Sequence, residues 1–99
     1  MKRLKFSLSL LLLLPLMPAG AQTIEHIDPP SWFTGMKESA LQLMVYGQGI
    51  GSFEVKTDYP GVNVSTLVRT ENPNYLFVNL NVTREARPGK VKLTFINGK

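Results

Sequence analysis

The sequence predicts a small all-β domain, a sandwich or a barrel of antiparallel strands, behind an N-terminal leader. Turn signals recur about every eight to twelve residues, and apolar and polar residues alternate between them. No stretch of the chain has a convincing helical period. With 99 residues, the chain is long enough for one domain at most.

The first 21 residues have the organisation of a signal peptide. A basic start at residues 1–5 precedes an apolar run at 6–17, and residues 19–21 (Ala-Gly-Ala) fit the small-residue cleavage rule. The apolar run is about a dozen residues long and contains proline, whereas a membrane span needs roughly 20 apolar residues. We therefore predict a signal peptide at 1–21, a mature domain at 22–99, export to the periplasm or secretion, and no membrane association after cleavage.

Period-2 alternation marks the strands in the rest of the chain. Ile24 and Ile27 break the alternation, which predicts that the first short strand bends or crosses between sheets. The clearest run carries Tyr75 and Phe77 on its outer face, so we expect that part of the face to be covered. The alternating runs lie at residues 41–45, 53–56, 62–65, 75–83 and 91–95.

Proline and glycine predict the turns between these strands. The segments Tyr59–Val62 and Arg87–Lys90 each have Pro-Gly at their centre, which suits a type II turn. Asn72-Pro73-Asn74 predicts a third turn. Three glycines between residues 47 and 51 predict a loop or bulge after a strand.

The charge and cysteine content exclude several classes of function. Without its three basic leader residues, the mature chain has eight basic and seven acidic residues, so the basic pI gives no support for nucleic-acid binding. Lys90 and Lys92 share one strand face and predict a solvated face or a guarded edge strand. The chain has no cysteine, which excludes disulfides, thiolate metal sites and cysteine nucleophiles.

No constellation in the sequence carries chemistry. His26 is the single histidine, beside Glu25 and Asp28 in the first short strand, and we interpret it as a surface residue. The carboxylates are scattered without the spacing of a metal site. So small a sandwich has little interior for the paired carboxyls of a glycosidase. We predict no catalytic residues, no metal site, no cofactor, and no enzymatic activity for this chain alone.

The end of the chain suggests a larger parent. Asn97-Gly98 is the strongest two-residue hairpin signal, yet only Lys99 follows it. Domains of this size bury only about 60% of their surface and are marginally stable alone. We expect a fragment of a larger protein, and the alternative is that Asn97-Gly98 is a frayed tail.

Trp32-Phe33, which follows the stiff pair Pro29-Pro30, is the most conspicuous aromatic feature. Three roles remain open for Trp32: a cap on the domain's own core, a contact with another domain, or a platform on which a sugar ring stacks.

Four segments resemble a known module: Ile27–Met36 (IDPPSWFTGM), Leu41–Gly47, Asn72–Val78 and Pro88–Phe95. Together they resemble the N-terminal domain of cyclomaltodextrinases and neopullulanases of the Bacteroidetes starch-utilisation type. These enzymes belong to the alpha-amylase family, glycoside hydrolase family 13. The resemblance covers essentially the whole mature chain, and its Pro-Pro-x-Trp-aromatic-Thr-Gly-Met stretch is its most specific part. Family members often have Trp at the position of Phe33, so this chain departs mildly from the pattern.

The resemblance implies an immunoglobulin-like sandwich of the early-set type that precedes a catalytic (β/α)₈ barrel. Such a barrel needs about 250 residues, so this chain cannot contain it, and no catalytic residue is carried over. The partners it implies are the enzyme's own barrel, a second copy in a homodimer, and malto-oligosaccharide. The positions that match such contacts are Trp32, Phe33, Thr34, Gly35 and Met36.

Two hypotheses follow. The first is a non-catalytic module of a secreted alpha-amylase-family enzyme of starch breakdown, which packs on the barrel and aids dimerisation or substrate access. The second is a stand-alone extracytoplasmic carbohydrate-binding or interaction domain whose stacking residues are Trp32, Phe33, Tyr46 and Tyr59.

Overall fold

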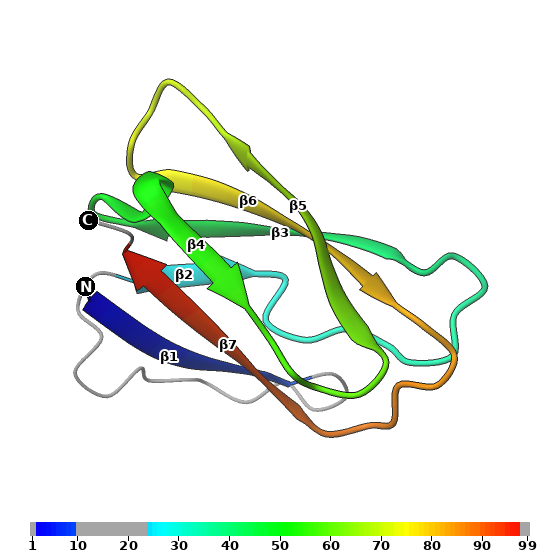
Figure 1. Cartoon of the computed structure of the whole chain (residues 1–99). Helices are drawn as coiled ribbons and strands as arrows, with labels where there is room; N and C mark the ends of the chain where they lie inside the picture. Colours follow the sequence, from blue (N-terminus) through cyan, green and yellow to red (C-terminus); the bar gives the residue numbers. More distant parts are fainter. Residues whose placement is uncertain (1, 10–23, 98–99) are drawn as a thin grey trace.

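The computed structural model describes residues 2–9 and 24–97, with the backbone alone for residues 2–9. The described chain forms two antiparallel sheets that face each other (Figure 1). One sheet has the strand order β2-β3-β6-β5 and the other the order β1-β7-β4. The elements are β1 (Lys2–Ser9), β2 (Ile24–Asp28), β3 (Ala40–Gly47), η1 (Ile50–Ser52), β4 (Phe53–Lys56), β5 (Val62–Arg69), β6 (Tyr75–Val82) and β7 (Lys90–Asn97). The prediction of an all-β sandwich is confirmed.

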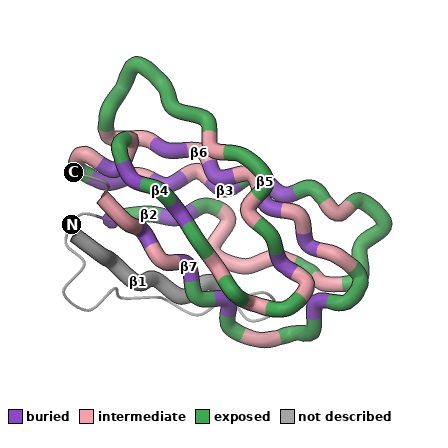
Figure 2. The backbone as a smooth tube through the Cα atoms, in the orientation of Figure 1, coloured by how far each residue is buried: buried purple, intermediate pink, exposed green. Residues whose placement is uncertain are grey.

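The core lies between the two sheets, and the predicted alternation fills it. Along β6 and β7, buried apolar residues alternate with more exposed ones (Figure 2). Because successive side chains on a strand point to opposite faces, each strand gives one face to the core. The largest fully buried side chains are Phe95, Leu43, Ile50, Leu76, Leu80 and Leu93.

The first predicted strand bends as expected. The register between β2 and β3 shifts between Ile24 and His26. This irregularity lets both Ile24 and Ile27 point into the core, although three positions separate them. The strand pairs with β3 and does not cross to the other sheet, so of the two expected alternatives the irregularity within one sheet is the one observed.

Strand β1 was not predicted, because its residues lie in the segment assigned to the signal peptide. It pairs with β7 over eight residue pairs, from Lys2↔Asn97 to Ser9↔Lys90. In the 99-residue chain β7 therefore lies between β1 and β4 and is not an edge strand. The predicted cleavage after Ala21 would remove β1 and leave β7 at the edge, so the guarded-edge interpretation of Lys90 and Lys92 stays a prediction for the mature chain. The predicted cleavage site after Ala21 lies outside the described residues, so the signal peptide remains a prediction. Gly98, the second residue of the Asn97-Gly98 hairpin signal, also lies outside them.

The turn at Tyr59–Val62 has the predicted type II geometry. Gly61 has φ of +84°, and the N–H of Val62 donates to the carbonyl of Tyr59 over 3.1 Å. That φ value lies in the region that glycine alone enters without strain. The turn at Asn72 is also confirmed, because the N–H of Tyr75 donates to the carbonyl of Asn72 over 3.3 Å.

The prediction of a type II turn at Arg87–Lys90 is wrong. Among the described glycines, positive φ occurs at Gly35, Gly49 and Gly61, and Gly89 is not one of them. Type II geometry requires positive φ at that third position. A Cβ at position 89 would stand 2.6 Å from the hydroxyl oxygen of Tyr59, so a larger residue there requires the phenol to shift.

Candidate interaction surfaces

The loop between β2 and β3 contains the five residues singled out from the sequence. Trp32 is half-buried and packs against the hydrophobic core, so the core-cap role is confirmed. Its anchorage fixes the start of the loop on the end of the sandwich. The adjacent ring of Phe33 lies 6.1 Å from that of Trp32, centroid to centroid, with the planes tilted by 56°.

The rest of this loop presents apolar groups to solvent. Phe33 is 63% exposed and Met36 is 40% exposed. Between them, Thr34 is half-buried and Gly35 has φ of +73°, which turns the chain. Three large hydrophobic side chains are exposed among the described residues, and Val68 is the third. An anchored tryptophan thus holds two exposed apolar side chains on one short loop.

The outer face of the β2-β3-β6-β5 sheet carries a row of aromatic rings that crosses three strands. His26 pairs with Tyr46, and Tyr46 pairs with Tyr75, so the three residues stand side by side. The Tyr46 and Tyr75 rings lie 4.9 Å apart, and the His26 and Tyr46 rings 6.2 Å apart. Both tyrosines are half-buried although they face away from the core.

A second row runs parallel to the first, about 7 Å along the strands. Phe77 pairs with Met44 on one side and with Val68 on the other. Beyond this apolar row comes a polar one in which the side-chain amide of Gln42 donates to Asn79, and that of Asn79 donates to Thr66. These bonds measure 2.9 and 2.8 Å. The face is therefore aromatic at one end, apolar in the middle and polar at the other end.

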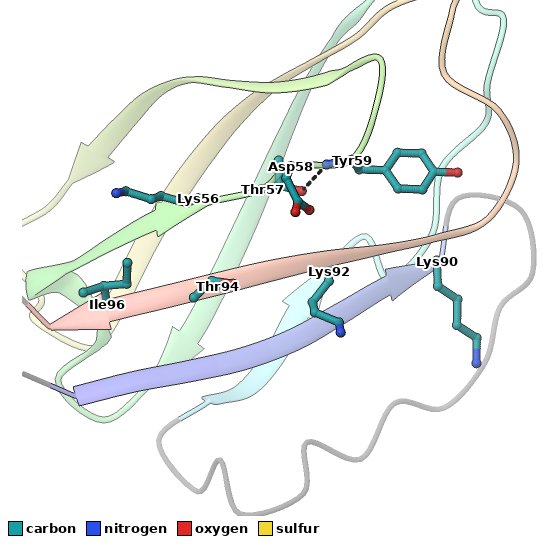
Figure 3. Close-up of a pocket in the computed structure, with 8 residues that line it drawn as sticks. All are labelled: Lys56, Thr57, Asp58, Tyr59, Lys90, Lys92, Thr94 and Ile96. Atoms are coloured by element: carbon teal, nitrogen blue, oxygen red, sulfur yellow. Dashed lines mark hydrogen bonds between the residues drawn. The ribbon is translucent and has the colours of Figure 1, made fainter.

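The outer face of the other sheet is charged and hollowed. A hollow of about 580 Å³ lies over β4, β7 and the turn that follows β4 (Figure 3). Three lysines, other polar residues and one isoleucine line it: Lys56, Thr57, Asp58, Tyr59, Lys90, Lys92, Thr94 and Ile96. Since the three lysines are exposed, this is the solvated face that the spacing of Lys90 and Lys92 predicted.

The four aromatic residues of the carbohydrate-binding hypothesis lie on three separate elements. Trp32 and Phe33 lie on the β2–β3 loop, Tyr46 on β3, and Tyr59 in the turn before β5. The Tyr59 hydroxyl donates to the carbonyl of Arg87, so its polar end is already bonded. Ring contacts join Tyr46 to His26 and Tyr75, and not to the other three.

The aromatic row at His26, Tyr46 and Tyr75 was missed from the sequence. Alternation places Tyr46 and Tyr75 on outer faces, but only the pairing register sets them opposite each other. Residues 24–97 contain no cluster of three potential metal ligands. Within that part of the chain, no helix is long and apolar enough to cross a membrane.

Comparison of the sequence with known families assigns the chain to a family. The model of the family described as "Cyclomaltodextrinase, N-terminal" matches residues 26–99. The match runs from the middle of β2 through every later strand and so includes the β2–β3 loop with Trp32, whereas β1 lies outside it. An immunoglobulin-like β-sandwich of two antiparallel sheets agrees with that family.

Proposed function

This chain belongs to the cyclomaltodextrinase N-terminal domain family, and from that premise we propose that it packs on a catalytic barrel and stabilises or positions it. The domain is a non-catalytic module of alpha-amylase-family glycoside hydrolases, and the chain contains no catalytic domain. Its proposed role is structural: it covers part of the barrel and aids dimerisation or the access of malto-oligosaccharide.

The observation that carries this proposal is the Trp32 loop. Trp32 packs into the core, while Phe33 and Met36 stay exposed on the same short loop. Exposed aromatic and methionine side chains are enriched at protein interfaces, where their burial adds binding free energy. Because Trp32 holds the loop, little conformational entropy is lost when the loop docks.

Export belongs to the same proposal. The basic start, apolar run and small-residue site at 1–21 support a signal peptide that directs the protein to the periplasm or the medium. Expression in a bacterial host, followed by mass spectrometry of the secreted or periplasmic product, tests this. A mature N-terminus at Gln22 supports export, and an intact N-terminus on protein retained in the cytoplasm rules it out.

The binding experiment uses a panel of cyclomaltodextrinase catalytic barrels prepared without their own N-terminal domains. Isothermal titration of the 99-residue chain into each barrel measures docking. We expect saturable binding to at least one barrel, and Phe33→Ala with Met36→Ala should weaken it. Lys92→Glu, on the outer face of the β1-β7-β4 sheet, is the control variant and should bind like the wild type. Absence of binding to every barrel contradicts the proposal.

Carbohydrate binding by the isolated domain is the second candidate, and the ring of Phe33 beside Trp32 favours it. A ligand that binds only the folded state raises the melting temperature. Thermal unfolding with and without maltoheptaose therefore tests it. A rise that Phe33→Ala abolishes supports sugar binding. An unchanged melting temperature leaves the structural role as the function.

A further inference from the structure

We propose that the outer face of the β2-β3-β6-β5 sheet is the main docking surface for the catalytic barrel, and that the Trp32 loop is only part of the contact. We call this surface the aromatic face, and it consists of His26, Met44, Tyr46, Val68, Tyr75 and Phe77. The inference rests on the proposed function and deepens it, because it names the surface that meets the barrel.

The two outer faces of the sandwich provide the first argument. On the β4–β7 face, Glu54 pairs with Ile96 and Lys56 pairs with Thr94, and Lys90 and Lys92 continue the charged strip. A face built in this way is suited to water. The aromatic face instead has His, Tyr, Phe, Met and Val at six outward positions, and the carboxylate of Asp28 stands opposite Met44 at the β2 edge.

The composition of the aromatic face matches the centre of an interface. Interface cores are depleted in charged residues and enriched in Tyr, Phe and Met, and they are surrounded by polar groups. Here the polar surround is Asp28 at one margin and the hydrogen-bonded amides of Gln42 and Asn79 at the other. The middle row is the apolar set Met44, Phe77 and Val68, of which Val68 is 43% exposed.

The path of the chain identifies the occupant. The last residue of β7, Asn97, pairs with Phe53 at the start of β4. Just before Phe53, the N–H of Gly51 donates to the carbonyl of Pro73 over 2.8 Å, next to Tyr75. In Figure 1 the tip of β7 accordingly lies at the end of the sandwich where β6 begins. In an N-terminal domain, the polypeptide therefore leaves from the β1-β7-β4 sheet, at the end of the sandwich where Tyr46 and Tyr75 lie. The barrel that follows starts within reach of the aromatic face.

The geometry also suits a broad protein surface better than a small ligand. The Tyr46 and Tyr75 rings are tilted by 50° to each other and are packed together, so they do not form one flat stacking platform. Strands spaced about 4.8 Å apart spread the two rows across the full width of the sheet. Interfaces between domains of one chain typically cover about 600–1,500 Å², which needs a surface of this breadth.

The test is titration of the 99-residue chain into a barrel that the wild-type chain binds. Val68→Glu and Tyr75→Glu each place a carboxylate in the aromatic face, and we expect each to weaken binding by about tenfold or more. Lys92→Glu adds the same charge change to the opposite face and should alter binding by less than about twofold. Because Val68 is exposed, we expect Val68→Glu to fold even if Tyr75→Glu is unfolded. Circular dichroism verifies the folding of each variant.

Each result supports the inference or overturns it. Loss of binding in folded Val68→Glu with an unchanged Lys92→Glu supports it. Wild-type binding that is lost in Phe33→Ala but not in Val68→Glu overturns it and leaves the proposed function standing. No binding by the wild-type chain overturns both. Measurements on the chain alone distinguish two other occupants, a second copy of the chain and a sugar. A dimer in sedimentation that Val68→Glu abolishes overturns the barrel as the occupant. Maltoheptaose binding that Tyr75→Glu abolishes overturns it as well.

Discussion

The hydroxyl of Tyr59 donates a hydrogen bond to the backbone carbonyl of Arg87, which follows it by 28 residues. This bond joins the turn between β4 and β5 to the turn that precedes β7. It also explains the close approach of Gly89, whose missing side chain leaves room for the phenol. Together with the two hydrogen bonds that Thr83 donates to the carbonyl of Gly61, the Tyr59 side chain holds together two loops at one end of the sandwich.

Replacement of Tyr59 by Phe removes this bond and leaves the ring in place. The carbonyl of Arg87 lies near solvent and can bond water, so we expect a loss of about 1 kcal/mol in the free energy of unfolding. Urea denaturation followed by circular dichroism measures the change. An unchanged midpoint would show that the bond contributes nothing to stability.

Replacement of Gly61 by Ala tests how closely the type II turn packs against the backbone of Ala86. A Cβ at Gly61 would stand 2.5 Å from the backbone nitrogen of Ala86, in addition to the strain of φ at +84°. We expect a loss of about 3 kcal/mol or failure to fold. Gly49→Ala is the matched control, since its φ is +73° but nothing lies within 4 Å of the added Cβ. Its cost should be about 1 kcal/mol, and equal losses in both variants would contradict the steric argument.

Arg69 links β5 to the beginning of β4. Its guanidinium donates to the backbone carbonyls of Gly51 and Phe53 and forms an ion pair with Glu54 at 2.8 Å. Both charged side chains are more than one-third exposed, so solvent screens the ion pair. We expect Glu54→Gln to cost less than about 0.5 kcal/mol, and Arg69→Ala about 1–2 kcal/mol because the carbonyls lose their donor. Comparable losses in the two variants, measured by thermal unfolding in low and high salt, would show that the ion pair dominates.

Substitutions at two phenylalanines are expected to affect the free energy of unfolding very differently. Phe95 is fully buried between the sheets, whereas Phe33 is mostly exposed on the Trp32 loop. Phe95→Ala should cost about 3–5 kcal/mol and unfold much of the population, because a small domain has little stability to spare. Phe33→Ala should change stability by less than about 0.5 kcal/mol, which makes it a valid probe of binding. Differential scanning calorimetry tests both, and a large loss in Phe33→Ala would place Phe33 in the fold's own packing.

Sequence reasoning succeeded where structure is local. Alternation with period 2 placed Leu43, Leu76 and Phe95 in the core, because successive side chains on a strand point to opposite faces whatever its neighbours are. The turn at Gly61 was also local, since Pro60-Gly61 sets its own backbone angles. Residues 27–36 form the most specific part of the resemblance, and the family that they indicated is the one whose model matches residues 26–99.

The candidate site could be predicted only in part. The five residues from Trp32 to Met36 were predicted as one contact segment, and the structure places Phe33 and Met36 at the surface of one anchored loop. Which of three roles Trp32 performs could not be read from its neighbours, because burial depends on segments distant in the chain. The type II prediction at Gly89 failed although Pro88-Gly89 has the expected local sequence, and the segment lies against Tyr59, 30 positions away.

The sequence by itself determined the strands from β2 to β7, their inward faces, most turns and the family. Only the tertiary structure decided which strands are neighbours, and hence that His26, Tyr46 and Tyr75 form one aromatic row while Lys56, Lys90 and Lys92 gather on the opposite face. The physical reason is that the direction of a side chain follows from its own strand, whereas its neighbours follow from hydrogen-bond register between segments tens of residues apart. Which side chains lie next to each other on an outer face is therefore set by that register.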